Sequence, residues 1–137
     1  MDQNRRLAQE LDRVARKIDA HMHKRMPQKD AARVGPMGAL LLMQLETSQP
    51  CSIQTLATAM GRDNSQLTRL IRDLEKKGVL ARMPHETDKR ISLLHLTDGG
   101  HAFLSAAKDT LKEVVEMVIE PLSTDERQVL VAILGKL

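Results

Sequence analysis

The chain has 137 residues, of which 42% are hydrophobic and 28% charged, a composition typical of one small soluble domain with appended helices. Phe103 is the only aromatic residue, which excludes modules that stack the bases of single-stranded nucleic acids on aromatic side chains. Cys51 is the only cysteine, which excludes an internal disulfide and a cysteine-based zinc finger. The longest apolar run, Val129–Leu134, has six residues, whereas a membrane helix needs about 20. Because the N-terminus is charged and lacks a signal-peptide pattern, we expect a cytoplasmic protein without a membrane partner.

The formal net charge of +3 is distributed unevenly along the chain. Residues 1–34 carry +4 and residues 62–97 carry +3, whereas residues 35–61 carry −1 and residues 98–137 carry −3. A local basic surface on a nearly neutral protein is compatible with phosphate binding. A solvated helix face explains the same charges without any function.

Residues 3–26 are predicted to form an amphipathic helix, because apolar residues recur at intervals of three or four. Pro27 is predicted to end this helix, and the polar stretch 28–36 is predicted to be a loop. Residues 37–47 are apolar on nearly all sides, which predicts a helix at the centre of the core.

A helix-turn-helix is predicted at residues 53–77. Ser52 is the expected N-cap of its first helix and Gly61 the residue that ends it. Asp63 is the expected N-cap of the second helix, with Gln66 as its capping-box partner. The inner face of the second helix follows the helical repeat with Leu67, Leu70, Ile71 and Leu74.

Two short strands follow, at 79–83 and 91–96, separated by a polar loop. Thr97 is predicted to cap a long helix, and the capping box Ser123–Glu126 to open a last one. The predicted fold is mainly α, with the order α-α-α-α-β-β-α-α. We expect a winged helix-turn-helix at residues 37–97, an N-terminal dimerisation helix and loop at 1–36, and C-terminal dimerisation helices at 98–137.

The first and last helices carry apolar stripes that no further layer of this short chain covers. Such stripes are commonly buried against a second copy, which predicts a homodimer. The residues expected at this contact are Leu7, Leu11, Val14, Ile18, Leu111, Val114, Val118, Val129, Leu130, Ile133 and Leu134.

The helix at 64–77 presents hydrogen-bonding and cationic side chains opposite its leucines. They are Ser65, Gln66, Thr68, Arg69, Arg72 and Lys76. A helix in the DNA major groove needs this pattern, because its N-terminal side chains reach base edges and arginine bridges two acceptors of guanine. An ordinary amphipathic helix with a polar exterior is the alternative explanation.

The loop between the strands carries Asp88, Lys89 and Arg90. An arginine on an extended loop can enter a narrow minor groove, and Asp88 would hold the guanidinium in position. A surface ion pair without function is the alternative. Arg62, Lys76, Lys77 and Lys89 are expected to contact the DNA backbone.

Several short motifs occur together in a fixed order between Leu56 and Gly99. They are Leu56-Ala57, Gly61, Leu67-Thr68-Arg69-Leu70-Ile71, Leu74-Glu75-Lys76-Lys77-Gly78-Val79-Leu80, Arg82, Asp88-Lys89-Arg90 and Leu94-His95-Leu96-Thr97-Asp98-Gly99. This set resembles the winged helix-turn-helix of the MarR family of transcriptional regulators. The length and helix order agree as well, so that the resemblance covers essentially the whole chain.

The resemblance implies a homodimer that binds a pseudo-palindromic operator. Gln66, Thr68 and Arg69 fall where such regulators read bases, and Arg90 falls at the minor-groove arginine. It also implies repression, relieved by a small anionic or phenolic effector. The chain departs from many relatives in its scarcity of aromatic residues, which argues against stacking of a phenolic effector; an apolar pocket with an arginine or histidine is the alternative.

Other chemistries find little support in the sequence. A redox role for Cys51 is weak, because relatives that sense peroxide carry their cysteine in the first helical region. His21 and His23 lie two positions apart on a helix and cannot chelate one metal ion together. We therefore predict no cofactor, no metal and no enzymatic activity. The competing function is a winged-helix module for protein interaction or DNA architecture, without recognition of a specific sequence.

Overall fold

The computed structural model describes residues 2–26 and 28–137, without the side chains of 28–33. The chain forms two compact units. One contains the first helix and the chain from Lys108 onward, and the other contains the intervening chain up to Ala107. The second unit holds the predicted winged helix-turn-helix, and the order of the helices and of the two wing strands agrees with the predicted fold class. Pro27, predicted to end the first helix, lies outside the described residues.

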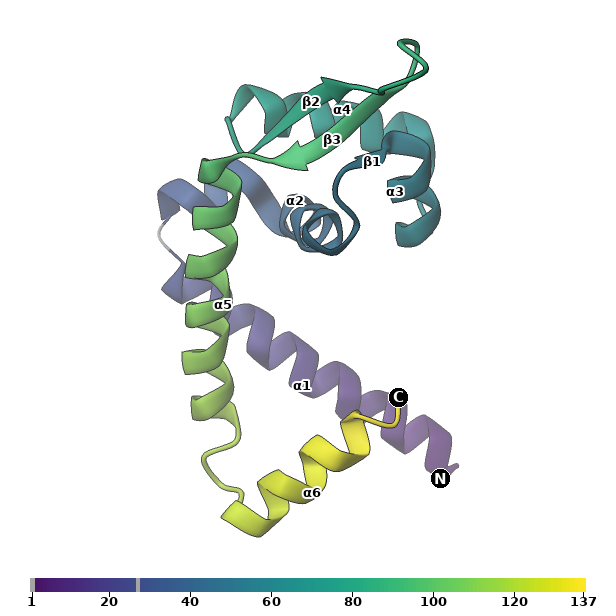
Figure 1. Ribbon diagram of the computed structural model, residues 1–137. Coiled ribbons are helices and arrows are strands. Elements are labelled where there is room, and N and C mark those ends of the chain that lie inside the picture. Colours follow the sequence, from purple (N-terminus) through teal and green to yellow (C-terminus); the bar gives the residue numbers. More distant parts are fainter. Residues whose placement is uncertain (1, 27) are drawn as a thin grey trace. The chain divides into compact units, whose positions relative to one another are not determined.

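The second unit contains several helices and a small sheet (Figure 1). Its elements are α2 (Gln28–Ser48), β1 (Cys51–Ser52), α3 (Ile53–Met60), α4 (Asn64–Lys76), β2 (Leu80–Pro84), β3 (Ser92–Leu96) and the beginning of α5 (Asp98–Val118). Helix α2 contacts α3, α4 and β3, while α4 contacts α3 and β2. Helix α4 and the strands β2 and β3 are therefore joined through one core.

The predicted caps of the helix-turn-helix are confirmed with one exception. The Ser52 hydroxyl accepts a hydrogen bond from the Thr55 N–H, and Gly61 ends α3 in the left-handed conformation with φ 61°. The Asp63 carboxylate caps α4 by accepting from the Ser65 N–H at 3.1 Å. The predicted capping-box bond from Gln66 is the exception: it is absent among the described residues, and the Gln66 side chain is exposed.

The core of the second unit consists of aliphatic side chains and the Cys51 thiol, and every element of the unit contributes to it. The buried members are Val34, Leu41, Leu42, Leu45, Cys51, Leu56, Ala57, Leu67, Ile71, Leu74, Val79, Leu80, Leu94, Leu96 and Leu104. Helix α2 is central, as predicted, although Leu40 and Met43 on its outer face remain about half exposed. The beginning of α5 belongs to this core through Leu104.

The sheet is antiparallel and has the order β1-β3-β2. Strands β2 and β3 are the predicted pair, with Leu80 opposite Leu96 and Arg82 opposite Leu94. Strand β1 was not predicted. It has two residues, of which Cys51 lies opposite Leu94, and two residues are too few to show an alternating pattern.

The prediction of a loop at residues 28–36 is wrong, because α2 begins at Gln28. Gly35 interrupts the helix with φ 71° and ψ 168°, and the helix continues after Pro36. Proline is well tolerated at the start of a helical segment, where its missing N–H is not needed. The Gly-Pro pair therefore marks a kink between two helical segments.

The first unit contains α1 (Gln3–Arg25), the remainder of α5 and α6 (Thr124–Leu134). The predicted capping box at Ser123 and Glu126 is present, and its hydrogen bonds lower the pKa of the Glu126 carboxyl. The Arg127 guanidinium donates to the carbonyls of Leu122 and Ile119, which fixes the turn between α5 and α6. No helix among the described residues is long and apolar enough to cross a membrane.

Candidate nucleic-acid interface

Helix α4 buries Leu67, Ile71 and Leu74 and thereby turns its polar face outward. On that face Ser65, Gln66, Arg69, Arg72 and Lys76 are exposed and Thr68 is half-buried. The amphipathic pattern thus places all the predicted recognition residues on one surface of one helix.

Two of the hydroxyl groups on α4 already donate hydrogen bonds within the protein. The Thr68 hydroxyl donates to the Asn64 carbonyl at 2.7 Å, and the Ser65 hydroxyl lies 3.1 Å from the Asp63 carboxylate. Thr68 is left with an acceptor lone pair and its methyl group. These groups suit an amino group of a base or the methyl group of thymine.

An ion pair that the sequence analysis did not single out fixes α4 against the sheet. The Arg82 Nε on β2 lies 2.8 Å from the Glu75 Oε1 on α4, and each side chain is 31% exposed. No sequence pattern indicates this ion pair, because the contact depends on how α4 packs on β2. The expected backbone contact Lys77 also has a partner, since its ammonium lies 2.8 Å from the Asp73 carboxylate.

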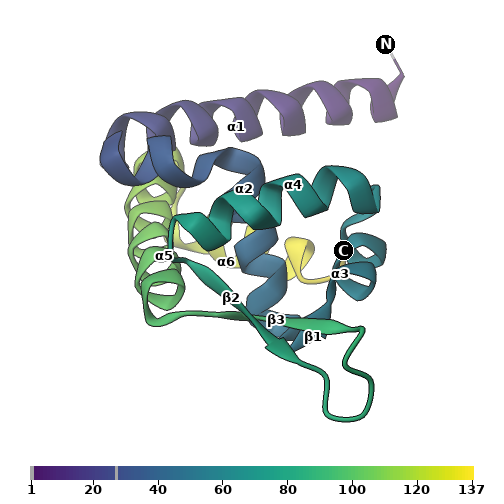
Figure 2. The ribbon, with the colours of Figure 1, turned by 90° about the horizontal axis from the view of Figure 1, so that it is seen from above.

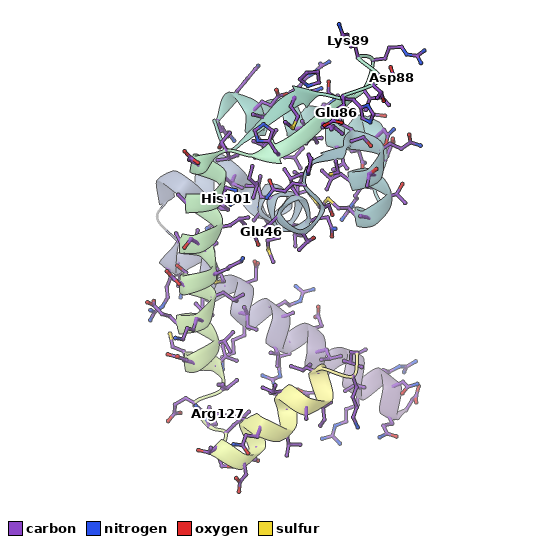
Figure 3. All side chains as sticks on the ribbon, viewed as in Figure 1. Glu46, Glu86, Asp88, Lys89, His101 and Arg127 are labelled. Atoms are coloured by element: carbon purple, nitrogen blue, oxygen red, sulfur yellow. The ribbon has the colours of Figure 1, made fainter. Side chains whose placement is uncertain are left out.

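The loop between β2 and β3, called the wing loop below (residues 85–91), extends beyond the sheet (Figure 2). Asp88 and Lys89 lie near its tip (Figure 3). The loop is closed by two backbone hydrogen bonds, from the His85 N–H to the Ile91 carbonyl and from the Ile91 N–H to the Asp88 carbonyl, both 3.1 Å.

Asp88 holds Arg90, as predicted, through both carboxylate oxygens. Oδ1 accepts from the Arg90 backbone N–H and from Nε, each at 3.1 Å, and Oδ2 accepts from Nη2 at 3.2 Å. These bonds to Arg90 lower the pKa of the Asp88 carboxyl. The Arg90 side chain is nevertheless 90% exposed. It is therefore oriented by its partner while its remaining N–H groups face solvent.

The apolar stripes of the first unit are exposed in the single protomer. Leu7 is 57% exposed on α1, and Ile133 and Leu134 are about half exposed on α6. Leu11, Leu111, Val129 and Leu130 are also exposed, while Val14, Ile18 and Val118 are partly buried. Val114 differs from the other expected contact residues, because it is fully buried within the protomer and has no surface left for a second copy.

A pocket of about 230 Å³ lies in the second unit beside the turn after α4. Val34, Ala102, Phe103 and Ala106 supply its apolar wall, and Lys77 supplies a cation. Phe103, the only aromatic residue of the chain, thus lines a cavity.

The two other candidate chemistries find no site in the described residues. Cys51 is buried on the edge strand β1, and this burial raises the pKa of its thiol. A raised pKa favours the protonated, less reactive form. No group of three or more His, Cys, Asp or Glu side chains in the described part of the chain is arranged to hold a metal ion.

Comparison with known proteins identifies proteins whose sequences are similar to this chain. Residues 39–92 match the family model described as the MarR family. The transcriptional repressor MprA of Escherichia coli strain K12 is 33% identical over 100 residues, which cover 72% of this chain and 57% of MprA. The matched region thus spans a little over half of the length of that curated relative.

Solved structures share the fold over nearly the whole chain. The reduced form of MarR from Escherichia coli superposes with a TM-score of 0.80 at 24% identity, covering 95% of this chain and 94% of that one. A mutant of MarR from Escherichia coli, complexed with operator DNA, superposes with a TM-score of 0.71 at 23% identity, covering 95% and 91%. At these identities the structures establish a common fold.

Proposed function

Because this chain belongs to the MarR family, we propose that it is a transcriptional regulator that binds a pseudo-palindromic operator in double-stranded DNA as a homodimer. The observation that carries the proposal is the position of Arg90, which is exposed and oriented by Asp88. The wing that bears it shares one hydrophobic core with α4, whose polar face is exposed. The relatives are named as transcriptional regulators, and such proteins are not enzymes.

In this proposal α4 lies in the major groove and reads bases. Arg69 can donate to the two acceptors of guanine, and Gln66 can donate to and accept from adenine. Thr68, whose hydroxyl proton is bound to the Asn64 carbonyl, would contact a thymine methyl or accept from an amino group. Ser65 can contribute as an acceptor, because its hydroxyl proton is directed to Asp63.

The wing enters the adjacent minor groove with Arg90. Asp88 engages Nε and Nη2, so Nη1 remains available to donate to the DNA. A narrow minor groove has a strongly negative potential, which favours a guanidinium that is held in advance in one orientation. Asp88 thereby reduces the side-chain entropy that the arginine loses on binding.

The remaining basic residues supply affinity that does not depend on sequence. Arg62, Arg72, Lys76 and Lys89 are exposed around α4 and the wing, where they can contact phosphates. Lys77 can do so after exchanging its bond to Asp73 for one to a phosphate. Such contacts fix the register of the protein on the duplex.

The dimer that the proposal requires is supported by the exposed apolar residues of α1, α5 and α6. Isolated surface leucines are common, whereas several on each of these helices form the kind of apolar surface that a second copy buries. Two copies would present two recognition helices to two half-sites of a palindrome.

We further propose that the protein represses transcription and that a small ligand in the pocket of the second unit releases it. The pocket joins α2 and α5 to the turn that follows the recognition helix, so that an occupant would bear on the position of α4. Its wall of small apolar side chains, Phe103 and the Lys77 ammonium suit a compact ligand with one anionic group.

The proposed function is tested by selecting duplexes from a random pool with the full-length protein. We expect an enriched palindrome and an affinity that falls steeply as salt increases. Recovery of a single sequence class with two half-sites supports the regulator. Salt-dependent binding without any sequence preference would instead favour an architectural module, and absence of duplex binding would favour a module for protein interaction.

Substitution of the base-reading residues is expected to change which operators are preferred. Thr68→Val keeps the methyl group but removes the acceptor, and Arg69→Ala removes the two donors to guanine. Each should cost about 1–3 kcal/mol on the selected operator and much less on duplexes altered at one base pair. Lys76→Ala, on the same helix, is the matched control and should weaken all duplexes equally. Equal losses for Thr68→Val or Arg69→Ala on every duplex would assign those residues to the DNA backbone.

A further inference from the structure

The wing loop turns around the imidazole ring of His85. The His85 Nδ1 accepts a hydrogen bond from the Asp88 N–H at 3.1 Å and one from the Thr87 N–H at 3.2 Å. The Thr87 hydroxyl oxygen lies 3.3 Å from the same nitrogen. His85 is partly buried and therefore lies against the loop that it organises.

These contacts place His85 at the start of a short chain of interactions that ends at the wing arginine. The ring fixes the backbone N–H of Asp88, and the Asp88 carboxylate fixes the backbone N–H and guanidinium of Arg90. The Arg90 guanidinium has no other partner within the described residues, so its orientation depends on the geometry of this turn.

The acceptor at Nδ1 exists in only one protonation state of the ring. A neutral imidazole with its proton on Nε2 accepts at Nδ1, whereas an imidazolium carries protons on both nitrogens and accepts at neither. Histidine is the side chain whose charge ordinarily changes between pH 5 and 8. Protonation of His85 would therefore replace these two hydrogen bonds with an Nδ1–H donor that faces the N–H donors of Thr87 and Asp88.

We propose that His85 is the positioning residue of the wing and that it holds Arg90 for the operator only while its ring is neutral. This inference rests on the proposed function, since it concerns the DNA contact of the same wing. It adds a regulation of that contact by proton concentration, which acts through the loop backbone rather than through the recognition helix.

The wing loop carries charged groups of both signs, and among them Asp88 links the ring to Arg90. Glu86, Asp88, Lys89 and Arg90 share the loop, and no hydrogen bond or ion pair within the described residues joins the ring to a charged group of another element. The pKa of Asp88 lies below its ordinary value, so Asp88 remains ionised from pH 8 to 5.5. An imidazolium at His85 would attract this carboxylate and compete with Arg90 for it.

The experiment compares wild type with His85→Asn and His85→Ala on the selected operator at pH 8 and 5.5, at constant ionic strength. Asparagine places an oxygen acceptor close to the position of Nδ1 and does not titrate. We expect wild type and His85→Asn to bind equally at pH 8 and wild type to bind about fivefold more weakly at pH 5.5, the effect of roughly one net hydrogen bond. His85→Ala should bind weakly at both values.

Two controls separate the wing from the general effect of positive charge, which by itself favours DNA binding at low pH. In the Arg90→Ala background, His85→Asn should change affinity at neither pH, because the residue that it positions is absent. His101→Asn, on the exposed side of α5, should keep the pH profile of wild type (Figure 3). Equal pH profiles for wild type and His85→Asn, or an undiminished effect without Arg90, would overturn the proposal.

A measurement on the free protein distinguishes failure of this inference from failure of the proposed function. By NMR, the amide signals of Thr87 and Asp88 should shift with the protonation of His85 in wild type and stay constant in His85→Asn. If wild type binds no duplex but these amides follow the ring, the proposed function fails while the role of His85 in the loop stands. Amide signals of Thr87 and Asp88 that do not change with the protonation of His85 would refute that role, whatever the result of the DNA measurement.

Discussion

Replacing Ile133 with aspartate is expected to separate the proposed dimer into protomers and to remove tight binding to the selected palindromic operator. Ile133 is 51% exposed on α6, within the apolar stripe proposed to meet a second copy. Burying an unpaired carboxylate in such a contact costs several kcal/mol. Because the two half-sites are then bound independently, the affinity for the palindrome should fall by about 10²–10⁴-fold. Light scattering gives the mass, and titration of the selected operator gives the affinity.

The matched control is Val131→Asp, which introduces the same charge into the same helix. Val131 is 71% exposed and lies outside the proposed stripe. We expect this variant to keep the mass and the operator affinity of wild type. A dimer that survives Ile133→Asp, or that is lost equally in both variants, would contradict the proposed stripe on α6.

Replacing Arg90 with alanine will weaken operator binding by about 1–3 kcal/mol and leave the fold and the dimer unchanged. The fold should be preserved because the side chain is 90% exposed and its ion pair with Asp88 lies at the surface, where such pairs contribute little to stability. The loss of affinity should be largest on operators with a narrow minor groove at the wing position. A salt-controlled gel shift measures the affinity, and circular dichroism measures the helix content.

Lys89→Ala provides the comparison within the same loop. Lys89 is exposed at the tip of the wing and is proposed to contact phosphate only (Figure 3). Its loss should weaken every duplex by a similar small factor and reduce the salt dependence by about one phosphate contact. Unchanged operator affinity in Arg90→Ala would remove the proposed minor-groove contact.

The parts of the fold that were predicted correctly depend on short stretches of sequence. The spacing of Leu67, Ile71 and Leu74 defines the inner face of α4, and with it the exposed face opposite. Ser52 and Asp63 satisfy the free N–H groups of the helices that follow them, which is a local requirement. The Asp88–Arg90 pair was also predictable, because the two residues are only two positions apart.

The features that were missed depend on contacts between distant segments or on the exact path of a loop. Strand β1 exists because Cys51 meets Leu94, a residue far along the chain. The Glu75–Arg82 pair forms only when α4 packs on β2, and Val114 is buried by packing within the protomer although it fits the apolar stripe. A periodic pattern shows that a side chain will be covered, but not by which surface.

The order of the helices, the two-helix motif with its wing, and the residue types proposed to contact DNA all follow from the amino-acid sequence, because helical spacing, caps and turns act between neighbours. How those residues are held follows only from the packed chain. The Thr68 hydroxyl donates to the Asn64 carbonyl, and Glu75 pairs with Arg82 to fix α4 to the sheet. The ring of His85 accepts from the backbone of the turn that carries Arg90. Hydrogen-bond partners depend on distances of a few tenths of an ångström and on donor direction, and only the folded backbone sets both.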